Sequence, residues 1–122
     1  MRKLLIAPLL LLLAVVGCSG ASTPAQMVFA AKSRYQIALD LADQYEDLPR
    51  CTLPDAPIAC SDPGIVDVLR KTDLAADSAL DNAEIVVRDP ASTESALSLA
   101  VASAQAAVAS LVEIVAALGL EE

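Results

Sequence analysis

The sequence predicts an all-α protein, a small three-helix bundle of antiparallel helices that follows a cleaved N-terminal leader. Apolar residues recur at three- and four-residue spacing over three long segments, which is the pattern of helices with one buried face. Sustained alternation of apolar and polar residues, the pattern of half-buried strands, is lacking. Prolines also stand where helices should begin or end. These are Pro24, Pro49, Pro63 and Pro90.

Residues 1–17 have the composition of an export signal. A cationic start, Met1-Arg2-Lys3, precedes an almost unbroken apolar run from Leu4 to Val16. This run is shorter than the roughly 20 apolar residues that a membrane-spanning helix needs. We therefore expect residues 1–17 to be a signal peptide that is removed on export.

The apolar run ends in Val15-Val16-Gly17-Cys18, which resembles the lipobox of bacterial lipoproteins. The resemblance covers the leader alone. It implies cleavage after Gly17, a diacylglyceryl group on the Cys18 thiol and acylation of the new amino terminus, which together make a stable membrane anchor. Ser19 is, by the same resemblance, permissive for the outer membrane. We expect a protein anchored at the periplasmic face of a membrane, the outer in preference to the inner, with residues 18–25 as lipidated N-terminus and flexible tether to a bundle domain at 26–122.

The first helix is predicted at about residues 24–48. Pro49 should end it, because proline disfavours helical geometry at the preceding residue and lacks an N–H donor. The predicted buried stripe consists of Met27, Ala31, Ala38, Leu41, Ala42, Tyr45 and Leu48.

The proline-rich loop at 49–63 contains Cys51 and Cys60. Export would place these thiols in an oxidising compartment, so we predict a structural disulfide, worth about 2.5–3 kcal/mol for a loop of this length. A redox pair and half of a metal site are the alternatives. Redox pairs usually have two intervening residues, and a zinc site would need two more ligands in a chain with no histidine and three cysteines.

The second helix is predicted at 62–88, where Asp62 and Pro63 are suited to the N-cap and the first helical position. Its predicted buried stripe consists of Ile65, Val68, Leu69, Thr72, Ala76, Ala79, Ala83 and Val86, and it leaves Leu74 on the polar side. The third helix is predicted at 90–118, with Asp89-Pro90 in the same role and Gly119 as C-cap. Its stripe consists of Leu97, Val101, Ala104, Val108, Leu111, Val112, Val115 and Leu118.

The third helix is apolar enough to be considered for a membrane span, because Glu113 is the single charged residue from Ala96 to Leu120. Gln105 and Glu113 are costly in hydrocarbon, and no Lys or Arg follows the helix. We therefore favour the central helix of a bundle. Burial against another copy or a partner is a further alternative, since a three-helix domain covers one helix incompletely.

Composition excludes several functions. A net charge of -8 argues against a nucleic-acid partner, and the lack of histidine removes the usual general base. Glycine-rich phosphate loops and calcium-loop patterns are missing, so we expect no cofactor, no metal site and no enzymatic activity. The remaining hypothesis is a bacterial or phage-encoded lipoprotein with a structural or protein-interaction role, bound to a protein partner or to itself. The alternatives are an envelope-perturbing or lysis lipoprotein, like spanin subunits or entericidins, and a carrier of hydrophobic ligands.

Overall fold

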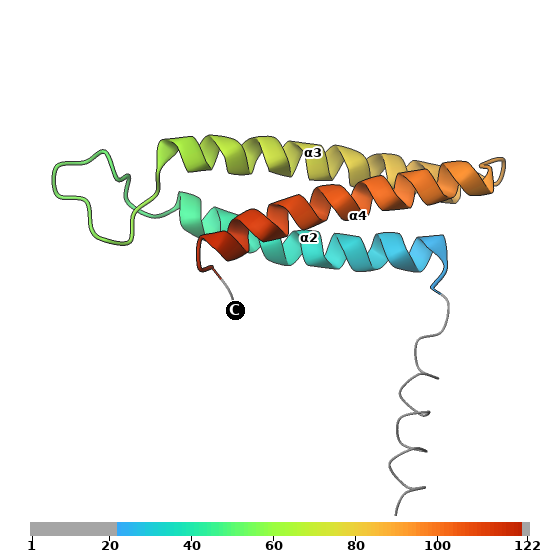
Figure 1. The fold of residues 1–122 in the computed structure, drawn as a ribbon, viewed down its shortest axis with the longest axis horizontal. Helices are drawn as coiled ribbons and strands as arrows, with labels where there is room; N and C mark the ends of the chain where they lie inside the picture. Colours follow the sequence, from blue (N-terminus) through green and yellow to red (C-terminus); the bar gives the residue numbers. More distant parts are fainter. Residues whose placement is uncertain (1–21, 121–122) are drawn as a thin grey trace, which may run out of the picture.

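The computed structural model describes residues 22–120 of the chain. The prediction of a small all-α bundle is confirmed, because three helices pack against one another in antiparallel succession and the described part contains no strand (Figure 1). The helices are α2 (Pro24–Glu46), α3 (Pro63–Arg88) and α4 (Glu94–Ala117). Since the direction of the chain reverses twice, α2 and α4 run parallel to each other.

α2 begins with a capping box. The Gln26 N–H donates to Thr23 Oγ1 at 3.2 Å, and the Thr23 N–H donates back to Gln26 Oε1 at 2.9 Å. Pro24 occupies the first turn, where its missing N–H leaves no intrahelical bond unmade. The helix ends at Glu46, two residues before the predicted end, because the last turn tightens ahead of Pro49.

α3 starts and ends where the sequence predicts. Asp62 is its N-cap, and the carboxylate accepts from the N–H groups of Gly64 at 2.7 Å and Ile65 at 3.2 Å. These bonds satisfy two of the amides that lack partners at a helix start, and the negative charge stands at the positive end of the helix dipole.

The predicted start of the third helix at residue 90 is wrong. Asp89 does not cap α4; its carboxylate accepts from the Ala91 N–H at 2.9 Å, and the Ser92 N–H donates to the Asp89 carbonyl at 3.1 Å. These two hydrogen bonds make residues 89–93 a turn. The turn is needed because the chain cannot reverse its direction between two helices through a single residue. Thr93 is the N-cap, with its hydroxyl accepting from the Ala96 N–H at 3.2 Å.

The C-terminal end of α4 confirms the glycine cap. Gly119 has a φ of 70°, in the left-handed region that glycine adopts without strain. Its N–H donates to the Ala116 carbonyl at 3.0 Å, and the Leu120 N–H donates to the Val115 carbonyl at 3.4 Å. This pair of bonds is a Schellman motif, and Leu120 packs against the core as that motif requires.

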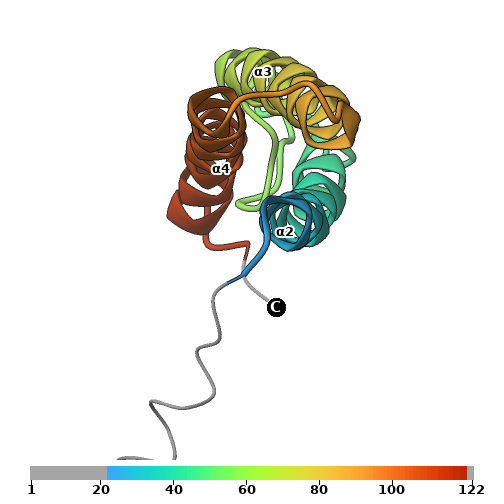
Figure 2. The same cartoon turned by 90° about the vertical axis from the view of Figure 1, so that its right-hand side faces the viewer.

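The three helices surround one core (Figure 2). Most of the predicted stripes contribute to it, but Met27 and Val68 are exposed, because each lies at the edge of its helix's buried face. Four buried residues were missing from the prediction: Val28, Tyr35, Leu80 and Ala100. The predicted solvent exposure of Leu74 is confirmed. The buried side chains are Val28, Ala31, Tyr35, Ala38, Ala42, Tyr45, Leu69, Ala76, Leu80, Ala83, Ala100, Val101, Ala104, Val108, Leu111 and Val115.

α4 packs against both other helices, as expected for the central helix of the bundle. Within the described residues it is the helix that is long and apolar enough to cross a membrane. One third of its most apolar 18-residue stretch is buried inside the protein, so a large part of its surface remains outward.

Tyr35 links α2 to α3 through a hydrogen bond in the core. Its hydroxyl donates to Asp73 Oδ1 at 2.6 Å. Burial of the ring, the hydrogen bond and the nearby charge of Asp73 raise the pKa of Tyr35 above its ordinary value, because each of them disfavours the phenolate.

Tyr35→Phe should lower the free energy of unfolding by about 1.5–3 kcal/mol at pH 7, since it removes a hydrogen bond to a charged group. In the unfolded chain tyrosine titrates near its ordinary pKa of about 10, whereas folded Tyr35 keeps its proton. The native state then binds more protons, so its stability falls as pH rises above about 10. Urea unfolding at pH 7, 9 and 11 should show the gap between the two proteins narrowing. A gap that is constant with pH would contradict this assignment.

Candidate interaction site at the disulfide loop

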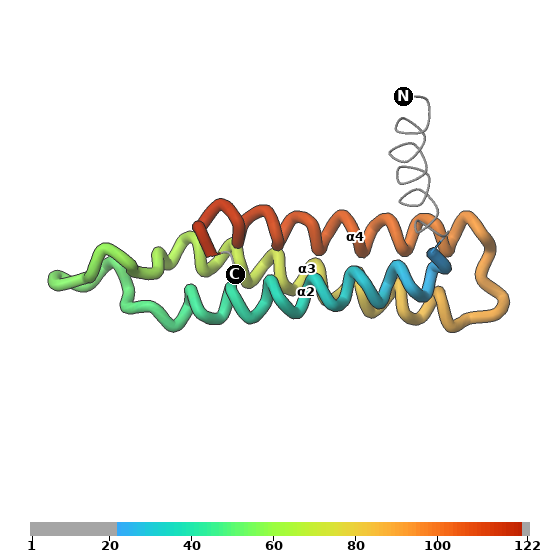
Figure 3. Tube along the Cα trace, turned by 90° about the horizontal axis from the view of Figure 1, so that it is seen from below, coloured from blue at the N-terminus to red at the C-terminus, as the bar shows by residue number. Residues whose placement is uncertain are grey.

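The loop at 49–62 connects α2 to α3 and extends beyond the ends of the helices (Figure 1). It lies at one end of the bundle, and the start of α2 lies at the other end, beside the turn between α3 and α4 (Figure 3). We call residues 49–62 the disulfide loop. It is the largest irregular segment of the described chain, and such loops on rigid scaffolds are where binding residues concentrate.

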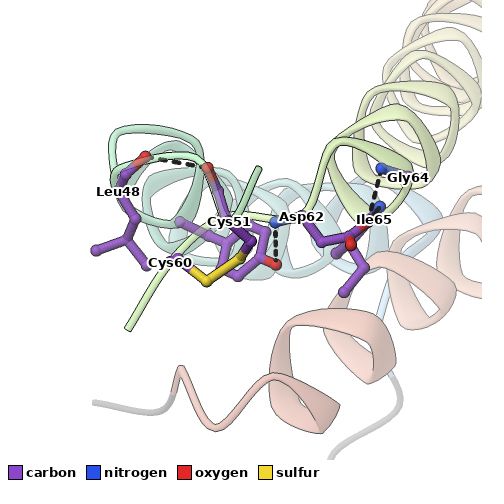
Figure 4. Close-up of a disulfide and its surroundings, with 8 residues drawn as sticks. Leu48, Cys51, Cys60, Asp62, Gly64 and Ile65 are labelled. Carbon is purple, nitrogen blue, oxygen red and sulfur yellow. Dashed lines mark hydrogen bonds between the residues drawn. A yellow bond between two sulfur atoms is a disulfide. The ribbon is translucent and has the colours of Figure 1, made fainter. Parts of the chain in front are cut away.

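The predicted disulfide between Cys51 and Cys60 is present (Figure 4). Their Cα atoms lie 5.0 Å apart, within the range that a disulfide spans. The bond closes the loop near its base and leaves residues 52–59 as a short closed tip. Among residues 22–120 no group of three or more His, Cys, Asp or Glu side chains could hold a metal ion.

Ser61 organises the base of the loop. Its N–H donates to the Pro49 carbonyl at 2.9 Å, and its carbonyl accepts from the Cys51 N–H at 3.0 Å. The hydroxyl, which is buried, donates to the Leu48 carbonyl at 3.0 Å (Figure 4). These three bonds join the two sides of the loop and satisfy a buried polar side chain, which would otherwise be costly to desolvate.

Tyr45 connects the end of α2 to the start of α3. Its buried hydroxyl accepts from the Asp62 N–H at 2.9 Å, so the residue that caps α3 is held by the last turn of α2 (Figure 4). Nearby, Glu46 accepts from Arg70 through Nη2 at 2.8 Å and Nε at 3.2 Å. This hydrogen bond raises the pKa of Arg70. The loop therefore connects two helix ends, of α2 and of α3, that are held together by hydrogen bonds.

The tip of the loop exposes two large apolar side chains. Ile58 is fully exposed, and Leu53 is 53% exposed. Pro54 and Pro57 lie between them and restrict the backbone, and the Ala56 N–H closes a turn on the Leu53 carbonyl at 3.1 Å. A stiff loop with exposed aliphatic side chains loses little conformational entropy when a partner covers it, which is the property of a preorganised binding site.

The sequence pattern predicts the roles of Cys51, Cys60 and Asp62 in this region, whereas the roles of Tyr45 and Ser61 are visible only in the structure. Their bonds join residues 17 and 13 positions apart, and no local pattern signals such pairs. The other predicted site residues, Gly17 and Cys18, lie outside the described part of the chain.

Comparisons with protein-family models, with curated proteins and with solved structures found no match to this chain.

Replacing both loop cysteines, Cys51→Ser with Cys60→Ser, should lower the free energy of unfolding by about 2.5–3 kcal/mol, because the unfolded chain regains the freedom that the closed loop removes. Chemical denaturation in oxidising and in reducing buffer would measure this. The parent protein should lose the same amount on reduction, and the double variant should not respond to reductant. If the free energy of unfolding of the parent protein is the same with and without reductant, the disulfide has no stabilising role.

Proposed function

We propose that the protein is a lipoprotein, anchored by acyl chains on Cys18 at the periplasmic face of a membrane, the outer membrane in preference to the inner. Its role is non-catalytic: it presents the disulfide loop to a protein partner at a distance from the membrane. The lipobox-like Val15-Val16-Gly17-Cys18 supports the anchor. A disulfide between Cys51 and Cys60 is in keeping with an exported protein.

The observation that carries the proposal is the position of the two ends of α2. The chain enters the bundle at Ser22, four residues after Cys18, and the disulfide loop follows the opposite end of this helix. At 1.5 Å per residue, the 23 residues of α2 span about 35 Å. An anchor on Cys18 would hold one end of the bundle near the lipid and direct the loop toward the aqueous compartment.

The packing of α4 favours an anchor at the N-terminus over insertion of this helix. Six α4 side chains, from Ala100 to Val115, are buried between α2 and α3. Moving α4 into a bilayer would unpack all of them and expose the apolar faces of the other two helices to water. It would also carry Gln105 and Glu113 into hydrocarbon.

A protein is the partner that suits the tip of the loop. Leu53 and Ile58 are aliphatic and exposed, and a partner would gain about 25 cal/mol for each Å² of apolar surface that it covers. The negative charge of the chain disfavours nucleic acid and anionic lipid surfaces.

The anchor can be tested by metabolic labelling of the full-length chain with a palmitate analogue in a double-membraned bacterium. We expect label in the parent chain and none in Cys18→Ser. An inhibitor of lipoprotein signal peptidase should cause the labelled precursor to accumulate. A Cys18→Ser chain that is cleaved normally and still sediments with membranes would contradict the proposed lipid anchor on Cys18.

The loop can be tested with a photo-crosslinking amino acid at position 58, where the side chain is fully exposed. We expect a discrete adduct in intact cells, which mass spectrometry would identify, and its loss when Leu53→Asp is added. The same probe at Leu74, which is exposed on α3, is the matched control and should give none. Equal adducts from both positions would contradict a specific role for the loop.

A further inference from the structure

α2 and α4 leave a shallow apolar groove between them on the side away from α3. Three adjoining hollows follow the line between the two helices, and the one nearest the end of α4 has a volume of about 300 Å³. Ala30, Arg34 and Ile37 line the groove from α2, and Gln105, Val112 and Ala116 line it from α4. We call this surface the α2–α4 groove.

The α2–α4 groove is poor in charge for an acidic protein, because Arg34 and Glu94 are the charged residues among those that line its three hollows. Glu113 is the single charged residue of α4 after Glu94. On the α2 side, Met27 is 36% exposed and Ile37 is 48% exposed. Two acidic copies of the chain repel each other, and a surface with few charges reduces this repulsion where the two grooves face each other.

The middle of the groove has a cation on the α2 side and an anion at its α4 edge, and a second anion, Glu94, lines the hollow at the start of α4. Arg34 lies on the α2 side, where it lines two adjoining hollows. Helical spacing places Glu113 at the α4 edge of the groove, because it follows Ala109 by four residues and precedes Ala116 by three, and both of these line the groove. Neither charge belongs to an ion pair among residues 22–120.

Arg34 and Glu113 also lie at nearly the same height along the bundle. One hollow is lined by Arg34 together with Val112, the residue just before Glu113. A surface with a cation on one side and an anion on the other, at one height, is complementary to a copy of itself.

We propose that the α2–α4 groove is the interface of a parallel homodimer. A two-fold axis running along the groove places the α2 side of one copy against the α4 side of the other. Arg34 then faces the partner's Glu113, and the pair occurs twice. An antiparallel dimer would place α2 against α2, which opposes Arg34 to Arg34 or leaves both charges unpaired.

The parallel arrangement also agrees with the anchor, and in this one respect it rests on the proposed function. Two parallel copies bring the starts of both α2 helices to the same end of the dimer, so anchors on the two Cys18 residues could enter one membrane. Confinement to that membrane raises the effective concentration of each copy for the other.

The size of the surface suits a weak or moderate dimer. A face of two adjacent helices, about 35 Å long and 20 Å wide, buries about 700 Å² per copy, close to the 800 Å² typical of specific interfaces. Because confinement to a membrane raises the effective concentration of each copy, an interface of this area is sufficient for dimerisation.

Cysteine cross-linking of the full-length chain in intact cells tests the geometry. Two differently tagged chains, one with Arg34→Cys and the other with Glu113→Cys, are expressed together and treated with a short bis-maleimide. We expect a mixed dimer carrying both tags, and little dimer from either chain alone. The parent chain and Leu74→Cys, on α3, are the controls. Efficient dimer from Arg34→Cys alone would overturn the parallel arrangement, and no mixed dimer above the controls would overturn the interface.

Charge reversal tests the ion pairs. The mass of the detergent-solubilised full-length chain is measured by light scattering. Arg34→Glu should weaken dimerisation at least tenfold, and the double variant Arg34→Glu with Glu113→Arg should restore it. Equal masses for all three proteins, or a monomer that carries a bound fatty acid in the groove, would overturn the proposal. Palmitate labelling reports on the anchor separately: cross-linked dimer without label would leave the dimer standing and remove the anchor.

Discussion

The close approach of the three helices depends on alanine. Seven of the sixteen buried apolar residues that the structure describes are alanines, and Ala76, Ala83 and Ala104 have no exposed surface at all. A methyl side chain lets two helix backbones come near each other without loss of rotamer entropy, but it gains little from leaving water. Each buried position therefore contributes less free energy to folding than it would in a leucine-rich core. The stability of the bundle relies more heavily on the hydrogen bonds and the disulfide at the ends of its helices.

These stabilising interactions lie at the ends of the helices. Thr23, Asp62 and Thr93 cap the three starts, and the motif at Gly119 closes the end of α4. At the α2–α3 junction the disulfide, the buried Ser61 and the bond from Asp62 to Tyr45 act together. The same junction fixes the base of the disulfide loop, whose exposed tip carries Ile58, the side chain that we propose to contact a partner.

α4 combines two roles that its sequence alone does not separate. One side of the helix is buried against α2 and α3, and another side lines the α2–α4 groove. A helix with so few charges is suited to a core, to a membrane or to another copy of the chain. Six of its side chains are buried, so one face of α4 belongs to the core. For the other face we propose contact with another copy of the chain, because Arg34 would pair with the partner's Glu113 across a two-fold axis.

Sequence by itself determined the features that depend on near neighbours. Helix periodicity, the cap at Asp62, the glycine at 119 and the pairing of Cys51 with Cys60 involve residues within about ten positions of one another, and all four are confirmed. The start of α4 was misplaced because Asp89-Pro90 has the composition of a helix start, whereas Asp89 bonds within a turn instead. Only the tertiary structure decided that Tyr35 reaches Asp73, that Tyr45 reaches Asp62 and that Arg34 lines one groove with Val112. These relations join separate helices, and they depend on how far each helix is rotated about its axis, which packing of the whole core sets and no local pattern encodes.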